Sequence, residues 1–251
     1  MTVPAALDVL AVGAHPDDVE LSAGGTVCLL TDGGYRVGIL DLTRGELGSR
    51  GTPETRRAEA DEAARILGLT TRDNLGLEDA GIVNSVESRL KFIRVIRRYR
   101  PHVVFTHPLE CRHPDHTAAA RLTVNGCFYS GLRKIETYDT GGRVQEPWRP
   151  HHVLHYAEVL HFEPTFVVDV SDTWERRIRA MQAYRTQFFH AEYRGEPDTF
   201  VSNPEFFAWI EARARTCGYP IGAAYGEAFS YRGTLGVRDL MGLLGSRKAF
   251  R

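Results

Sequence analysis

The sequence has few cysteines, no excess charge of either sign and no long hydrophobic run. Its 31 Lys and Arg residues nearly balance 32 Asp and Glu residues, so the formal net charge is −1 over 251 residues. Binding to nucleic-acid phosphates or to an anionic membrane normally needs a basic surface, so we expect neither partner. A membrane-spanning helix needs about 20 apolar residues in a row, and no run approaches that length. Residues 1–4 lack the basic start of a secretion signal, so we expect a cytoplasmic protein.

The four cysteines are scattered through the chain, and no C-x-x-C pair is present. They are Cys28, Cys111, Cys127 and Cys217. Scattered cysteines in a chain without a secretion signal favour reduced thiols in the cytoplasm. A structural thiolate zinc site would need paired cysteines, so the sequence predicts no such site.

The glycine fingerprint of dinucleotide-binding folds is also absent, although strands and helices alternate through the first half of the chain. Apolar runs predict strands, and periodic or capped segments predict the helices between them. The expected strands are residues 7–12, 37–43, 69–75 and 103–106, and the expected helices are 19–30, 53–67, 86–100 and 114–130. This alternation is typical of a Rossmann-like α/β fold, with a mostly parallel open sheet and helices on both faces.

The second half predicts an antiparallel addition to this sheet, within a single domain spanning residues 1–251. Residues 153–160 and 166–170 are expected strands with no long helix between them. Asp172 and Glu175 have capping-box spacing for a helix that runs to residue 184. The remaining expected elements are a helix over 204–218 and a strand over 223–229.

A histidine and two aspartates directly follow the first expected strand, in the segment Ala14-His15-Pro16-Asp17-Asp18. In open α/β sheets, ligands bind in the crevice beyond the carboxyl ends of the strands. His15 and Asp18 are three residues apart, so their side chains can converge on one point, and Asp17 must then point elsewhere. A catalytic Zn²⁺ site uses three nitrogen or oxygen ligands from the protein and keeps an open position for water.

The segment His113-Pro114-Asp115-His116 follows the expected strand at 103–106 and can supply the third ligand. Pro114 suits the first position of a helix, so His113 and His116 lie near its N-terminus, roughly on one side. Each motif alone has a simpler explanation, because His15 would serve as a turn histidine and the two aspartates as a helix cap. Together the two motifs favour a metal-dependent hydrolase.

These motifs, with Gly24-Gly25-Thr26 between them, resemble the LmbE-like or PIG-L-like family of zinc-dependent N-acetylglucosamine deacetylases. Glycines are costly inside a helix, so the pair at 24–25 predicts close packing of the backbone against the metal site. The likeness covers most of the chain to about Phe229. Its further segments are Asp41-Leu42-Thr43, Gly51-Thr52, Arg56-Arg57-Ala58-Glu59-Ala60, Asn74-Leu75, Asp79-Ala80-Gly81, Ala183-Tyr184, Gln187-Phe188 and Glu227-Ala228-Phe229.

The chain looks most similar to the branch that deacetylates N-acetylglucosaminyl malate in bacillithiol biosynthesis. The alternative enzyme is a deacetylase of another N-acylated sugar, such as diacetylchitobiose. The alternative outside enzymes is a carbohydrate- or metal-binding module on an inactivated scaffold. Such a module would have lost Asp17 or a metal ligand, and all of these residues are present.

The resemblance implies one Zn²⁺ per chain, held by the ligands His15, Asp18 and His116. It also implies that Asp17 takes a proton from the attacking water as general base. His113 would stabilise the oxyanion or protonate the leaving amine. Asp115 would orient His113, or would simply place a negative charge at a helix N-terminus, where it is favourable.

The resemblance places substrate recognition at Arg56, early in the helix at 53–67, where a cation opposes the helix dipole. A guanidinium suits bidentate recognition of the substrate's carboxylate, and a solvated helix face is the simpler explanation. Two positions depart from the family pattern, because His152 replaces an arginine and Phe206 replaces a tyrosine. The branch also implies a homo-oligomer, often a hexamer, with residues 200–209 as either an apolar contact or part of the core.

Overall fold

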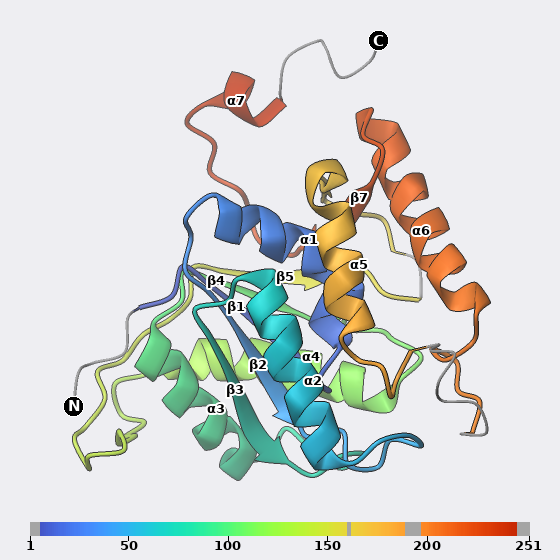
Figure 1. Ribbon diagram of the computed structural model, residues 1–251. Helices are drawn as coiled ribbons and strands as arrows, with labels where there is room; N and C mark the ends of the chain where they lie inside the picture. Colours follow the sequence, from blue (N-terminus) through green and yellow to red (C-terminus); the bar gives the residue numbers. More distant parts are fainter. Residues whose placement is uncertain (1–5, 160–161, 189–196, 245–251) are drawn as a thin grey trace.

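The computed structural model describes residues 6–159, 162–188 and 197–244, which form a seven-stranded sheet with helices on both faces (Figure 1). Residues 1–4 and the predicted strand end at residue 160 lie outside the described part of the chain. The sheet order is β3-β2-β1-β4-β5-β7-β6. The strands are β1 (Val9–Gly13), β2 (Val37–Thr43), β3 (Thr71–Leu77), β4 (Val103–Thr106), β5 (His152–Tyr156), β6 (Phe166–Asp169) and β7 (Gly226–Tyr231).

The strand pairing confirms a parallel sheet with an antiparallel addition. β1 lies between β2 and β4 and pairs with both in parallel. β3 extends the parallel pairing beyond β2, and β5 extends it beyond β4. β7 then pairs antiparallel with β5 on one side and β6 on the other.

The helices cover both faces of the sheet, as the alternation of elements predicts. They are α1 (Asp18–Asp32), α2 (Pro53–Leu67), α3 (Val86–Tyr99), α4 (Pro114–Ser130), α5 (Trp174–Gln182), α6 (Glu205–Gly218) and α7 (Leu240–Leu244), with 3₁₀ turns η1 (Ser171–Thr173) and η2 (Tyr219–Ile221). Leu10 and Val12 of β1 pack in one buried cluster with residues of α3 and α4. Val9 and Ala11 of the same strand pack in another with residues of α1, α2 and α5. Successive side chains of a strand point to opposite faces, so the central strand builds both cores.

Local sequence sets where the helices next to the site begin. Pro53 and Pro114 occupy the first turns of α2 and α4, where the missing N–H of proline leaves no helical bond unmade. Thr52 accepts a hydrogen bond from the Thr55 backbone N–H and completes a capping box. His113 occupies the corresponding capping position of α4. The predicted starts of both helices are confirmed.

Gly24 and Gly25 lie inside α1, but the prediction that they pack against the metal site is wrong. A Cβ on Gly24 would lie 3.0 Å from Cγ of Arg177, and one on Gly25 would lie 2.8 Å from Cβ of Val170. The Gly25 N–H also donates to the Glu227 carboxylate at 2.8 Å. The two glycines therefore allow α1 to approach the residues that precede and form α5, together with β7.

The predicted capping box of Asp172 and Glu175 is also wrong. Residues 171–173 form the 3₁₀ turn η1, and α5 begins only at Trp174. Thr173, at the N-cap of α5, makes no side-chain capping bond. Its hydroxyl donates to the Gly25 carbonyl at 2.9 Å, which ties the start of α5 to α1. Among the described helices, none combines the length and the apolar character that crossing a membrane requires.

Candidate metal centre

The candidate site lies where the parallel strands β1, β4 and β5 end at one edge of the sheet. The first motif follows β1, His107 follows β4, Glu158 lies two residues beyond β5, and α4 carries the second motif. Side chains of both motifs and Glu158 line a cavity of about 320 Å³. The apolar residues in its lining include Leu21, Val159, Phe200, Val201, Phe206 and Trp209.

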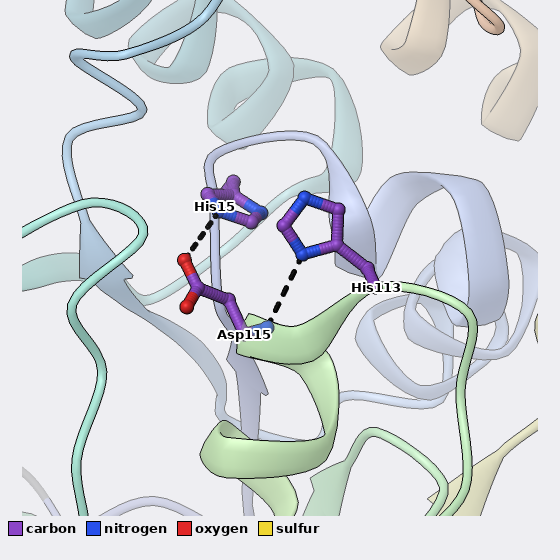
Figure 2. A group of neighbouring side chains, drawn as sticks. All are labelled: His15, His113 and Asp115. Atoms are coloured by element: carbon purple, nitrogen blue, oxygen red, sulfur yellow. Dashed lines mark hydrogen bonds and ion pairs between the residues drawn. The ribbon is translucent and has the colours of Figure 1, made fainter.

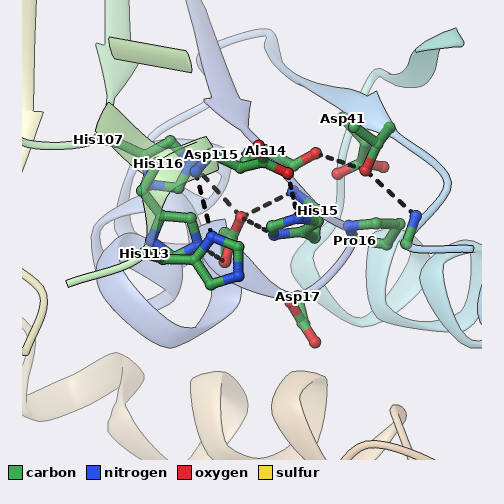
Figure 3. Close-up of polar contacts among 12 residues, drawn as sticks. Ala14, His15, Pro16, Asp17, Asp41, His107, His113, Asp115 and His116 are labelled. Carbon is green, nitrogen blue, oxygen red and sulfur yellow. Dashed lines mark hydrogen bonds and ion pairs between the residues drawn. The ribbon is translucent and has the colours of Figure 1, made fainter. Parts of the chain in front are cut away.

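Asp17 has an unusual backbone conformation that separates its side chain from that of Asp18. It is the N-cap of α1, with φ 122° and ψ −27°. A non-glycine residue in such a sparsely populated region costs about 1–3 kcal/mol and is held there by its surroundings. Asp18 Oδ2 accepts the His15 backbone N–H at 2.7 Å, and Arg56 donates to the Pro16 carbonyl. Figure 3 shows the Asp17 carboxylate apart from the imidazole cluster.

The three predicted ligands converge. Asp18 Oδ2 lies 3.4 Å from His15 Nδ1, and Asp18 Oδ1 lies 3.2 Å from His116 Nε2. One donor atom from each residue lies within 4.8 Å of the other two. Burial raises the pKa of the Asp18 carboxyl, but His116 and His107 outweigh it and hold that pKa well below its usual range. Two imidazole nitrogens and a carboxylate oxygen fit Zn²⁺ in a catalytic site, with a position left for water.

Each of the two candidate ligand histidines has a carboxylate next to its second ring nitrogen. His15 Nε2 lies 3.0 Å from Asp79 Oδ1, and His116 Nδ1 lies 2.8 Å from Glu158 Oε2. Carboxylates in this position fix the tautomer and orientation of metal-binding imidazoles. The sequence analysis gave neither carboxylate a role. Glu158 follows the end of a strand at the same edge of the sheet, and that position is the signal that would have found it.

His107 is a buried histidine that the sequence analysis missed (Figure 3). Its Nε2 accepts the Ala14 backbone N–H at 2.7 Å, and its Nδ1 binds Glu158. Its ring stacks on that of His116, with centroids 4.3 Å apart. Burial lowers the pKa of His107, which favours the neutral ring that accepts from Ala14. Because Ala14 occupies Nε2, we interpret His107 as a support for His116 and not as a metal ligand.

Asp17 and Arg56 form a buried ion pair beside the three ligands. Arg56 Nη2 lies 3.0 Å from Asp17 Oδ2, and Arg56 Nη1 donates to Gln187 Oε1 at 3.1 Å. Burial raises the pKa of the Asp17 carboxyl to about 7, although Arg56 acts in the opposite direction. The Arg56 side chain is only 5% exposed, so it does not lie on a solvated helix face. Its guanidinium lines the cavity, but Asp17 and Gln187 already occupy two of its nitrogens.

His113 and Asp115 both lie beside His15, and the Asp115 carboxylate points toward the His15 ring (Figure 2). His113 Nδ1 accepts the Asp115 backbone N–H at 3.3 Å, which leaves Nε2 to carry the proton of a neutral ring. Burial lowers the pKa of His113, and the nearby His116 and His15 lower it further. The Asp115 carboxylate lies 3.4 Å from His15 Nε2 and accepts the Ala80 N–H at 2.8 Å. The Asp115 carboxylate thus faces His15, so the expected pairing of this carboxylate with His113 is not formed, and only the Asp115 backbone contacts His113.

Among the other positions that the resemblance singled out, three make structural contacts and one lines the cavity. The hydroxyl of Tyr184 donates to the Glu20 carboxylate. The Glu227 carboxylate accepts hydrogen bonds from the backbone N–H groups of Gly25 and Thr26. His152 begins β5, at the end of the strand away from the site, and binds the Tyr231 hydroxyl. Phe206, in contrast, lines the cavity.

The chain is similar to known proteins in sequence and in fold. The profile of a family described as PIG-L, GlcNAc-PI de-N-acetylase, matches residues 10–127, which include both motifs. Diacetylchitobiose deacetylase of Thermococcus kodakarensis is 31% identical over 191 residues, covering 72% of this chain and 70% of that protein. The probable N-acetyl-alpha-D-glucosaminyl L-malate deacetylase 2 of Bacillus cereus is 29% identical over 200 residues, covering 71% and 83%. The solved structure of the conserved protein TT1542 from Thermus thermophilus is 40% identical and superposes with a TM-score of 0.81, covering 92% of this chain and 98% of that one.

Proposed function

Because this chain belongs to the PIG-L family of de-N-acetylases, we propose that it is a zinc-dependent hydrolase that removes the acetyl group from an N-acetylglucosaminyl small molecule. N-acetylglucosaminyl malate, in bacillithiol biosynthesis, is the substrate we propose first. Diacetylchitobiose is the alternative. The Thermococcus kodakarensis and Bacillus cereus relatives are named for these two substrates. They are similarly identical to this chain, so they support both substrates.

The convergence of His15, Asp18 and His116 is the observation that carries this proposal. A Zn²⁺ ion held there would polarise an amide carbonyl and lower the pKa of a water molecule. A carbohydrate-binding module needs neither this donor set nor a buried carboxylate beside it. The presence of Asp17 next to the donor set therefore favours a hydrolase.

The residues around the donor set match the proton transfers of amide hydrolysis. Asp17 accepts the proton of the attacking water, and a carboxyl whose pKa is near 7 suits this role at neutral pH. His113 presents Nε2–H to the carbonyl oxygen as it becomes negatively charged. The proton held by Asp17 then passes to the departing nitrogen, and acetate and a free amine are the products.

Two arginines on the cavity wall support a substrate with an anionic aglycone. Arg112 stacks on Phe200, with its guanidinium carbon 4.1 Å from the ring centroid, and Arg213 stacks on Trp209 at 5.0 Å. Among the described residues, no carboxylate lies within ion-pair distance of either guanidinium. Arg213 donates to the Leu21 carbonyl at 2.7 Å. A malate carboxylate would add an anionic partner for these arginines, in addition to or in place of a contact with Arg56.

A substrate panel tests this proposal. The zinc-loaded protein is incubated with N-acetylglucosaminyl malate, with diacetylchitobiose and with an N-acetylglucosaminide of a neutral alcohol, and free amine is measured. We expect release from the malate compound at the highest kcat/KM. Faster release from diacetylchitobiose would identify the alternative substrate. Binding of these sugars without any amine release would support the binding module instead.

We also propose that the chain forms a single domain and a cytoplasmic homo-oligomer, with a hexamer as the expected size. Within residues 200–209, Phe206 is 5% exposed and belongs to the core, whereas Phe200 is 48% exposed. An apolar contact between copies would therefore use Phe200 and not Phe206. Light scattering at micromolar concentration tests the assembly, and a monomer would contradict it.

A further inference from the structure

Glu158 accepts hydrogen bonds from three side chains at the buried end of the cavity. Its side chain is 7% exposed. Oε1 binds His107 Nδ1. Oε2 lies 2.8 Å from His116 Nδ1 and accepts from Cys111 Sγ at 2.7 Å. The three donors come from one stretch, between the end of β4 and the first turn of α4, so Glu158 ties the segment that follows β5 to that stretch.

The directions of these bonds follow from the Ala14 backbone. The Ala14 N–H donates to His107 Nε2, so the proton of the neutral His107 ring lies on Nδ1 and is donated to Glu158. A carboxylate offers only acceptors, so His116 must also donate from Nδ1. The lone pair of His116 then lies on Nε2, the atom 3.2 Å from Asp18 Oδ1. A chain of hydrogen bonds thus connects the backbone of the first motif to the imidazole of the second.

We propose that Glu158 is a positioning residue that holds His116 with its proton on Nδ1 and its lone pair on Nε2, ready to bind the metal. This inference rests on the proposed function in one respect, because it takes His116 as a ligand. Glu158 acts through His116 and does not touch the reacting atoms. Loss of a carboxylate behind a metal-binding histidine typically weakens metal binding by about 10–100-fold.

The substitution Glu158→Gln separates this role from simple packing, because it keeps the size of the side chain. An amide offers one acceptor oxygen, and its nitrogen only donates. His107 must keep its proton on Nδ1, because Ala14 occupies Nε2, so the amide oxygen will face His107. The amide nitrogen then faces His116 Nδ1, which must become an acceptor. The His116 proton moves to Nε2, where it blocks metal binding.

Two measurements test the proposal, and neither depends on catalytic activity. Competition with a chromophoric chelator gives the Zn²⁺ affinity, which we expect to fall by about 10–100-fold in Glu158→Gln. Glu59→Gln is the matched control, because Glu59 is a partly buried carboxylate that accepts from Thr186 and touches no imidazole. We expect its Zn²⁺ affinity to be unchanged. Unchanged affinity in a folded Glu158→Gln protein would overturn the proposal.

The second measurement uses the unmodified protein, so it remains decisive if Glu158→Gln does not fold. Nitrogen-15 NMR of the zinc-loaded protein reports which ring nitrogen of His116 carries the proton, and we expect Nδ1, because the metal then occupies Nε2. A proton on Nε2 would overturn the proposal. So would two Zn²⁺ per chain with Glu158 as a ligand, since His107, His116 and Glu158 can also surround an ion. If the panel of sugars releases no amine while both results hold, the proposed function fails and the role of Glu158 stands.

Discussion

The guanidinium of Arg56 lies 3.0 Å from the carboxylate of Asp17, and both side chains are almost fully buried. The resemblance assigned these residues to separate tasks, substrate recognition and proton transfer. The structure makes them one ion pair. Removing either partner of such a pair leaves the other charge buried and uncompensated, which is costly.

We therefore expect Arg56→Ala to lower kcat/KM for charged and neutral substrates alike. A buried charge-assisted hydrogen bond is worth about 1.5–3 kcal/mol, which corresponds to a loss on the order of 10- to 150-fold. Arg56 opposes the rise in the pKa of Asp17. Without it that pKa is higher, and the pH at which activity appears should move upward because the base works only when deprotonated. The exposed neighbour Arg57 provides the control variant, Arg57→Ala. A loss confined to N-acetylglucosaminyl malate would instead show that Arg56 binds the aglycone directly.

Asp17→Asn should retain the metal and the fold while losing most of its activity. The amide keeps the shape of the side chain but cannot accept the proton of the attacking water. General-base catalysis contributes on the order of 10²–10⁴-fold, and we expect kcat to fall by that factor. Single-turnover kinetics on zinc-loaded protein measure the loss. Wild-type turnover in this variant would remove Asp17 from the mechanism.

The metal ligands should be separable from the other histidines by elemental analysis. We expect His15→Ala and His116→Ala each to lose bound zinc, because each removes one of three donors. His102 is an exposed histidine outside the cavity, so His102→Ala is the control and should keep one Zn²⁺ per chain. Full zinc content in both ligand variants would show that the ion binds elsewhere.

Gly25→Ala should destabilise the protein, although alanine normally favours a helix. The new Cβ would lie 2.8 Å from Val170 Cβ and 2.9 Å from Glu227 Oε1, which forces α1 away from its neighbours. Overpacking of this kind costs about 1–3 kcal/mol. Chemical denaturation gives the free energy of unfolding. Gly33→Ala is the control, since its Cβ would meet no described atom closer than 3.4 Å, and equal stability of the two variants would contradict the packing argument.

Most of the fold was predictable because its signals are local. Apolar runs such as 37–43 and proline-led starts such as Pro53 and Pro114 fix elements without reference to distant residues. The capping box at Asp172 failed because residues 171–173 form the 3₁₀ turn η1, and the Thr173 hydroxyl contacts a carbonyl of α1. A tertiary contact of this kind has no counterpart in the local sequence.

The candidate site likewise has one part that the sequence predicts and another part that it does not. Its two motifs are contiguous segments at strand ends, so the sequence predicted that they meet, and the family resemblance then assigned His15, Asp18 and His116 as the ligands. Glu158 and His107 are single residues with no motif around them. Their importance comes from the pairing of β4 and β5 beside β1, which brings three strand ends to one edge. Only the topology of the sheet shows that they meet.

The most direct test of the central claim is a titration of Zn²⁺ into the metal-free protein while amine release from N-acetylglucosaminyl malate or diacetylchitobiose is recorded. The three proposed ligands converge on one candidate site in the cavity, next to Asp17 and His113. The rate should therefore rise in proportion to added zinc and level off at one equivalent per chain, and a chelator should abolish it. Amine release at the full rate without metal would contradict a zinc-dependent deacetylase, as would its absence at every zinc concentration and with both sugars.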